Sequence, residues 1–62
     1  MIVKGKISSI NASTNQAEVI LLEYEFAVTA PLPLYRSYTS YQIGQPVVVV
    51  VFNGDFNDAI VL

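Results

Sequence analysis

Four oxygen-bearing side chains lie within six residues near the end of the chain: Asn53, Asp55, Asn57 and Asp58. Calcium loops use such ligands around a sharp glycine turn, and they need six to eight oxygens. The spacing of an EF-hand loop is absent here, and no bidentate glutamate follows. Asparagine, aspartate and glycine are also the ordinary residues of a tight turn. We therefore expect a polar hairpin tip and no metal site.

A second pair of carboxylates, Glu23 and Glu25, would share one face of a strand. Paired carboxylates of this kind converge on one bond in glycosidases. Those enzymes also need a cleft for a sugar and a buried acid with a raised pKa. A chain of 62 residues leaves little room for either around its core. We expect a solvated acidic strand end or turn.

Nucleophilic catalysis in its ordinary form is excluded by composition. The chain has no histidine to activate a serine, and it has no cysteine. Lys4 and Lys6 flank Gly5 on an expected strand and are predicted to be solvated. We therefore predict that the protein is not an enzyme and that it uses no cofactor.

The aromatic residues are the strongest functional signal: Tyr24, Phe26, Tyr35, Tyr38 and Tyr41. Small barrels that bind single-stranded nucleic acid stack bases on aromatic side chains in a positively charged groove. Acidic residues flank Tyr24 here, and the net charge of −2 gives no attraction to phosphates. Tyrosine is also enriched at protein interfaces. We favour a protein interface, or a layer covering the barrel end, over nucleic acid.

The elements that must position these residues begin with the most apolar stretch. Val47 to Phe52 is predicted to be a strand because branched side chains pack well on a pleated surface. Asn53-Gly54 then predicts a tight hairpin, with a last strand from about Asp58 to Leu62. Six apolar residues in succession indicate a strand buried on both faces, or one that closes a barrel.

Three more strands are expected before this hairpin. Ile2 to Ile10 forms the first, and Gly5 inside it indicates a bulge or sharp bend. A polar turn from Asn11 to Asn15 leads to a second strand at Ala17 to Leu22. The third is placed at Ala27 to Leu34, with the turn before it near Glu23 to Glu25.

Alternation within the third strand predicts its two faces. Val28, Ala30, Leu32 and Leu34 should lie on one side, with Thr29, Pro31 and Pro33 on the other. Proline cannot donate a ladder hydrogen bond, so this strand should be an edge or a place where another chain packs. Tyr35 to Gln42 is the longest connection and the expected place for a short helical turn. The turn Ile43 to Pro46 follows, with Pro46 tolerated as the first residue of the next strand.

Five short strands in a single domain, residues 1–62, predict an all-β fold. A small antiparallel Greek-key barrel of the OB type fits best, and an SH3-like barrel is the alternative. A domain of this size is marginally stable without disulfides, metals or oligomerisation. The chain lacks cysteine and histidine, and it is 53% hydrophobic. We therefore expect self-association through a surface made of Pro31, Leu32, Pro33, Tyr35, Tyr38 and Tyr41.

The pattern also resembles a known family, the small OB-fold domain of phage baseplate and tail-spike proteins. These proteins are of the baseplate assembly protein V type and are related to the type VI secretion spike. The opening of that domain, G-x-[IV]-x-x-[IV], is matched by Gly5 to Ile10. A polar turn and apolar strand are matched by Asn11 to Leu22, and a Leu-Pro by Leu32-Pro33. The most specific part is the ending, which Tyr41 to Leu62 match.

This resemblance implies a structural role in a symmetric collar or hub, with a trimer favoured. The partners would be other tail or baseplate proteins, and the location the virion, after synthesis in the bacterial host cytoplasm. Two departures are evident: no β-helical needle follows the barrel, so membrane piercing is not implied, and the third strand lacks the family's tryptophan. The chain fits either a stand-alone protein of a phage or prophage, or one domain of a longer chain. A single-strand binder, or a small adaptor or inhibitor of a host protein, are the alternative functions.

Overall fold

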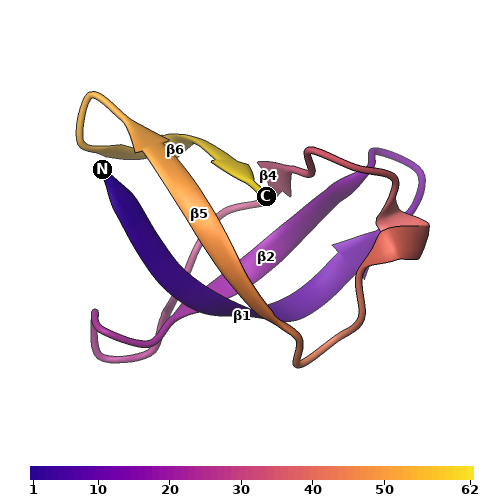
Figure 1. Ribbon diagram of the computed structural model, residues 1–62, viewed down its shortest axis with the longest axis horizontal. Helices are drawn as coiled ribbons and strands as arrows, with labels where there is room; N and C mark the ends of the chain where they lie inside the picture. Colours follow the sequence, from indigo (N-terminus) through magenta and orange to yellow (C-terminus); the bar gives the residue numbers. More distant parts are fainter.

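The computed structural model describes residues 1–62 and is all-β apart from one short 3-10 turn. β1 (Ile2–Asn11) and β2 (Gln16–Leu21) form a long hairpin. Two short strands follow, β3 (Ala27–Val28) and β4 (Leu32–Pro33), and then the 3-10 turn η1 (Tyr38–Ser40). β5 (Pro46–Phe52) and β6 (Asp55–Val61) form the closing hairpin (Figure 1). No helical segment is long and apolar enough to cross a membrane.

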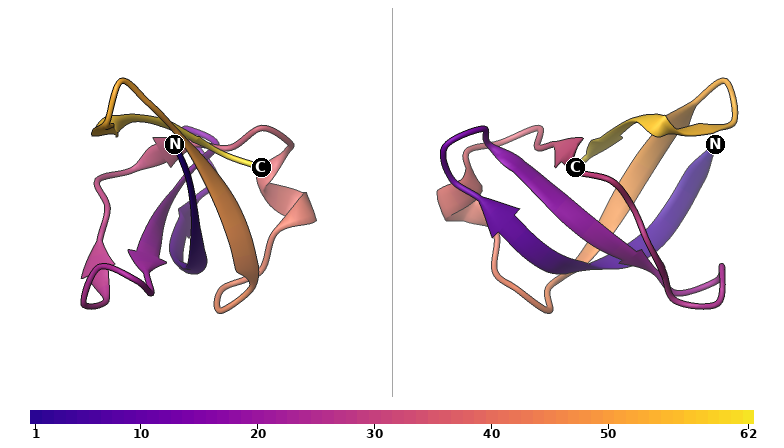
Figure 2. Two further views of the ribbon diagram at one scale, coloured as in Figure 1. Left: turned by 60° about the vertical axis from the view of Figure 1, so that its left-hand side comes forward. Right: turned by 180° about the vertical axis from the view of Figure 1, so that it is seen from behind.

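The strands form one curled antiparallel sheet in which β1 bends between its two neighbours (Figures 1 and 2). β1 pairs with β2 on one side and with β5 on the other, and β2 pairs with both β3 and β4. A strand that returns after a long connection to lie beside the first strand makes a Greek key. The predicted all-β fold, a small antiparallel barrel, is confirmed at this level.

The predicted third strand is an edge of the sheet at β3, and its end approaches β6. β4 pairs with β2, and the next residue, Leu34, forms a parallel bridge with Val61 of β6. The Leu34 N–H donates to the Asn15 carbonyl (3.1 Å), and the Tyr35 N–H donates to the Val61 carbonyl (2.8 Å). The residue after β4 therefore brings the two ends of the curled sheet together, while β3 keeps the predicted edge position and β4 pairs with β2 alone.

The core contains every second residue of the long strands. Along β5, Val47, Val49 and Val51 are buried while Val48 is exposed and Val50 is half-buried. The apolar run is therefore buried on one face only, which corrects the prediction of a strand buried on both faces. A pleated strand places successive side chains on opposite faces whatever their polarity. The valines of the outer face are thus left at the surface.

Gly5 does not mark a bulge, which was one of the two features predicted for it; the other was a bend of the strand. The irregularity of β1 lies between Ile7 and Ser9. Gly5 is buried, and a Cβ there would lie 2.7 Å from the Ile20 carbonyl oxygen and would also overlap the Val19 side chain. Glycine is therefore required because the backbones of β1 and β2 approach each other closely where the sheet curls.

A one-residue bulge divides the third strand and changes which side chains face inward. Ile20 of β2 pairs with Val28 of β3, and Ala17 of β2 pairs with Leu32 of β4. Three residues along β2 therefore correspond to four residues along the opposite segment. An extra residue reverses the alternation that follows it. Leu32 and Leu34 are buried as predicted, but Val28 and Ala30 are exposed and Thr29 is buried instead.

The closing hairpin turns at Asn53-Gly54 as predicted, with both residues at positive φ (55° and 68°). β6 begins at Asp55, earlier than the predicted Asp58, but it is irregular at first. Phe52 pairs with Asp55 and Val51 pairs with Ala59, so one step along β5 corresponds to four along β6. The regular ladder begins only at Ala59, and residues 56–58 protrude from it.

Candidate protein-interaction surfaces

The six residues predicted to form an interface separate into two groups. Pro31, Pro33, Tyr35 and Tyr38 are exposed, and we call them the tyrosine-proline surface. Leu32 and Tyr41 belong to the hydrophobic core and are only 1% and 4% exposed. Their place in the predicted surface was wrong, because Leu32 lies on the inner face of β4 and Tyr41 turns its ring into the barrel.

Tyr41 fixes the loop that carries the exposed tyrosines. Its hydroxyl donates to the Val61 carbonyl (3.3 Å) and accepts from the Arg36 N–H (3.3 Å). The Arg36 guanidinium lies 5.4 Å from the centre of the Tyr41 ring, within the range of a cation–π contact. A buried tyrosine hydroxyl usually finds such partners. Tyr41 therefore ties the loop before η1 to the last strand.

Asn15 holds the same loop from the β1–β2 turn. Its side-chain amide donates to the Arg36 carbonyl (3.1 Å), and its side-chain oxygen accepts from the Tyr38 N–H (2.7 Å). Asn15 has a positive φ of 54°, which asparagine tolerates better than most residues. The Ser37 hydroxyl caps η1 by accepting from the Thr39 N–H (3.4 Å). The tyrosine-proline surface thus stands on a fixed loop.

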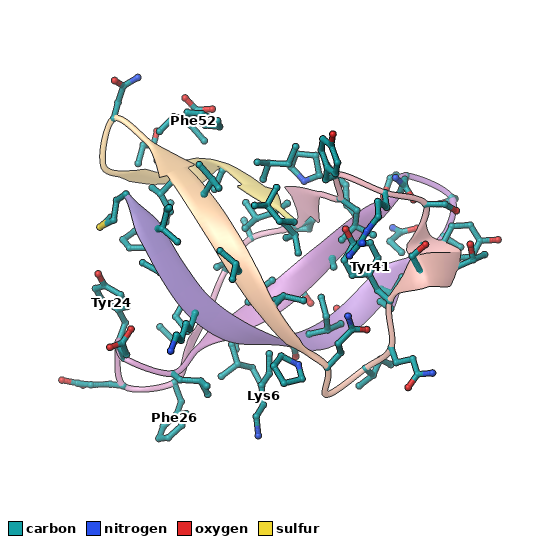
Figure 3. All side chains as sticks on the ribbon, in the orientation of Figure 1. Lys6, Tyr24, Phe26, Tyr41 and Phe52 are labelled. Carbon is teal, nitrogen blue, oxygen red and sulfur yellow. The ribbon has the colours of Figure 1, made fainter.

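A second apolar surface lies at the opposite end of the long axis, where Figure 3 labels Tyr24, Phe26 and Phe52. The Tyr24 and Phe56 rings meet edge to face, with centroids 5.2 Å apart and planes at 69°. Beside them is a groove of about 320 Å³. We call Tyr24, Phe26, Val28 and Phe56 the aromatic end. The groove lining consists of Leu21, Tyr24, Ala27, Val28, Thr29, Ala30, Phe56 and Asn57.

Phe26 stands out within the aromatic end because of its backbone. Both Glu25 and Phe26 have positive φ angles (57° and 58°), and the Ala27 N–H donates to the Tyr24 carbonyl (3.0 Å) across them. A left-handed conformation costs a residue other than glycine about 1–2 kcal/mol. Asn53 and Gly54 occupy the same two consecutive positive-φ positions in the other hairpin, with the residue types that such turns favour. The β2–β3 loop instead carries a phenylalanine there.

Packing within the chain does not account for this phenylalanine. Phe26 is 67% exposed, and it is absent from the groups that pack against the core. In Figure 3 its ring points away from the barrel. Sparsely populated backbone conformations cluster at functional sites, where another requirement maintains them. The strained turn therefore identifies this loop as a candidate functional segment.

Acidic side chains surround the aromatic end. Glu23 and Glu25 are exposed in the loop that carries Tyr24 and Phe26, and Asp55 and Asp58 are exposed on either side of Phe56 and Asn57. One Asp55 carboxylate oxygen accepts from the Asn57 N–H (2.9 Å). No group of three or more metal-binding side chains gathers here or elsewhere in the chain. Two cations lie near this end as well: the ammonium group of Met1, whose Sδ accepts from the Tyr24 hydroxyl (3.7 Å), and Lys6, which is on the ladder through Ile20 to Val28. The four carboxylates still leave this end with a net negative charge.

A larger groove of about 580 Å³ has the opposite character. It is lined by two of the three basic side chains, Lys4 and Arg36, together with apolar residues of β5. No aromatic side chain lines it. This groove therefore combines two cations with apolar residues and has no aromatic ring in its lining.

Sequence reasoning identified Tyr24 and Phe26 but missed Phe56. Phe56 follows the Asn-Gly turn and was assigned to the hairpin tip. It reaches Tyr24 because residues 56–58 protrude from the β6 ladder, and a bulge of that kind depends on strand register. The only local signal was an aromatic residue within a polar turn.

No protein-family model matches this chain, and no curated protein does either.

Proposed function

We propose that this chain is a structural assembly module that works through protein–protein contacts and self-association. The resemblance of its ending to baseplate domains supports a place in a phage tail, a baseplate or a phage-derived particle. Its partners there would be other tail proteins and further copies of the chain, with a trimer favoured.

The observation that carries this proposal is the amount of apolar surface. Eleven large hydrophobic side chains are exposed, against thirteen residues in the core cluster. Single exposed apolar residues are ordinary, but contiguous patches mark interaction sites. Tyr35, exposed by 69%, and Tyr38, exposed by 40%, lie on the loop that Asn15 and Tyr41 fix. A fixed loop loses little conformational entropy when it binds.

Self-association is tested by size exclusion with light scattering. The wild-type chain is expected to form a defined oligomer at concentrations of about 10–100 µM, the range of a modest interface of about 5.5–7 kcal/mol. A Tyr35→Ser, Tyr38→Ser double variant should be monomeric, because it removes the two largest exposed rings of the surface. Ile43→Ser is the matched control, since Ile43 is 71% exposed and lies outside both surfaces. A monomeric wild-type chain would contradict self-association.

The second candidate is a single-strand nucleic-acid binder, because OB-type barrels bind oligonucleotides and Lys4 and Arg36 share one groove. The lack of aromatic side chains in the lining of that groove weighs against it, since such binders place rings inside a charged channel. Fluorescence anisotropy with labelled oligonucleotides at low salt decides the question. Absence of binding up to about 100 µM would remove this function, because low salt strengthens every phosphate contact.

A further inference from the structure

We infer that the aromatic end is a second docking surface, distinct from the tyrosine-proline surface, and that its occupant is a partner-protein segment with basic side chains around an apolar centre. Phe26 would be the main anchor, inserting into that partner. The inference does not depend on self-association, because η1 and the β2–β3 loop, which carry parts of the two surfaces, lie at opposite ends of the long axis (Figure 1).

The strained turn is the first argument. Phe26 is held at a φ of 58° and exposed by 67%, so it contributes unfavourable backbone geometry and little packing. The Asn53-Gly54 turn of the same chain places the usual residues at two consecutive positive-φ positions. A phenylalanine is therefore not needed to make the β2–β3 turn. It is explained if the ring is used outside the chain.

The shape of the surface is the second argument. The edge-to-face contact with Phe56 holds Tyr24 beside the groove, and Val28, exposed by 54%, forms another part of its wall. The groove volume of about 320 Å³ is at the lower limit for small-molecule pockets, which occupy about 300–1,000 Å³. It suits an apolar side chain of a partner better than a cofactor. Aromatic anchors in a fixed arrangement are typical of binding hot spots.

Charge identifies the occupant. Four of the five acidic residues of the chain are exposed around this end: Glu23, Glu25, Asp55 and Asp58. Charged rims of an interface meet opposite charges, and like charges facing each other are strongly disfavoured. A second copy docking with the same surface would bring eight carboxylates together. An anionic lipid surface or a nucleic acid would be repelled in the same way. A basic, partly apolar protein segment is complementary both to the acidic side chains and to the apolar groove.

Defined peptides test the chemistry of the occupant. The first probe is a synthetic peptide of alternating lysine and leucine, and the second has glutamate in place of each lysine. In an NMR titration, the lysine peptide is expected to shift the amide signals of residues 23–28 and of Phe56. Its affinity should fall as salt rises from about 50 to 500 mM. Equal binding of the glutamate peptide, binding centred on residues 31–38, or no binding of either peptide would overturn the inference.

Phe26→Gly separates docking from folding. It should weaken binding of the lysine peptide at least about thirtyfold, the effect of losing a hot-spot residue. It should also raise Tm by about 4–8 °C, because glycine relieves the strained backbone. Ile43→Ser, the matched exposed apolar residue, should leave peptide affinity unchanged. A lower Tm for Phe26→Gly, or unchanged affinity, would contradict the role given to this ring.

Two further measurements distinguish the other occupants. Loss of self-association in Phe26→Gly would assign the aromatic end to a second copy of the chain and overturn the inference. Co-sedimentation of the wild-type chain with neutral phosphatidylcholine vesicles, abolished by Phe26→Gly, would assign it to a lipid surface and overturn it as well. Neither result is expected, and both are distinguishable from failure of the tyrosine-proline surface to self-associate.

Discussion

At the scale of single residues, the side chains of Asn15 and Tyr41 hold the loop around η1, which no strand pairing holds. Asn15 bonds the Arg36 carbonyl and the Tyr38 N–H, and the Tyr41 hydroxyl bonds the Arg36 N–H and the Val61 carbonyl. The loop before and within η1 has almost no side chains in the core. Its order therefore depends on these polar contacts, each worth about 0.5–1.5 kcal/mol net.

Substitutions of Asn15 should separate its two roles. Asn15→Gly keeps the left-handed backbone but loses both side-chain hydrogen bonds, and we expect it to lower the free energy of unfolding by about 1–2 kcal/mol. Asn15→Ala also forces alanine to adopt a φ near 54° and should lose about 1 kcal/mol more. Urea denaturation measures both, and amide exchange at Tyr38 reports the loop itself. The prediction fails if alanine is no worse than glycine.

At the scale of elements, two bulges determine which side chains face outward. The bulge in the third strand turns Val28 outward and Thr29 inward, and the irregular start of β6 brings Phe56 to Tyr24. Both features form the aromatic end. β-Bulges commonly re-aim side chains near functional sites. The docking surface is therefore a product of irregular register rather than of any one strand.

Thr29 offers a test of the first bulge. The buried Thr29 hydroxyl accepts a hydrogen bond from the Val19 N–H (3.1 Å), and the backbone N–H of Thr29 donates to the Val19 carbonyl (2.9 Å). Thr29→Val preserves the shape but leaves a buried N–H without a partner, which costs about 1–3 kcal/mol. Thr29→Ser keeps the hydroxyl and should be markedly more stable than Thr29→Val in thermal unfolding. Equal stability of the two variants would show that the hydroxyl is dispensable.

At the scale of the whole molecule, the barrel is a short rigid spacer between two surfaces. η1, which carries Tyr38, and the β2–β3 loop, which carries Phe26, lie at opposite ends of a body 26 Å long on its longest axis (Figure 1). The hydrogen bonds of Asn15 and Tyr41 hold the loop of the tyrosine-proline surface. The contact between the Tyr24 and Phe56 rings holds the aromatic end. A chain of this form would connect copies of itself to a second protein.

The two surfaces should act independently. The Tyr35→Ser, Tyr38→Ser double variant is expected to retain lysine-peptide affinity per chain, and Phe26→Gly is expected to retain the wild-type oligomeric state. Distant sites without shared partners are additive to within about 0.3–0.5 kcal/mol. Light scattering and calorimetric titration on both variants and their combination measure this. A coupling well above that range would show that binding at one end alters the other.

The amino-acid sequence by itself determined β1, β2 and β5, the Asn-Gly hairpin and the place of η1, because those signals are local. It also predicted a small β-barrel, which the structure confirms, and an interface made by aromatic residues, which stays a prediction. Strand register could not be predicted from the sequence. One extra residue in the third strand determined that Val28 faces outward and Thr29 inward. Closure of the barrel buried Leu32 and Tyr41. The pairing of Tyr24 with Phe56, and the two separate surfaces, exist only once distant segments pack. Register and closure depend on contacts between residues far apart in the chain, which no local pattern encodes.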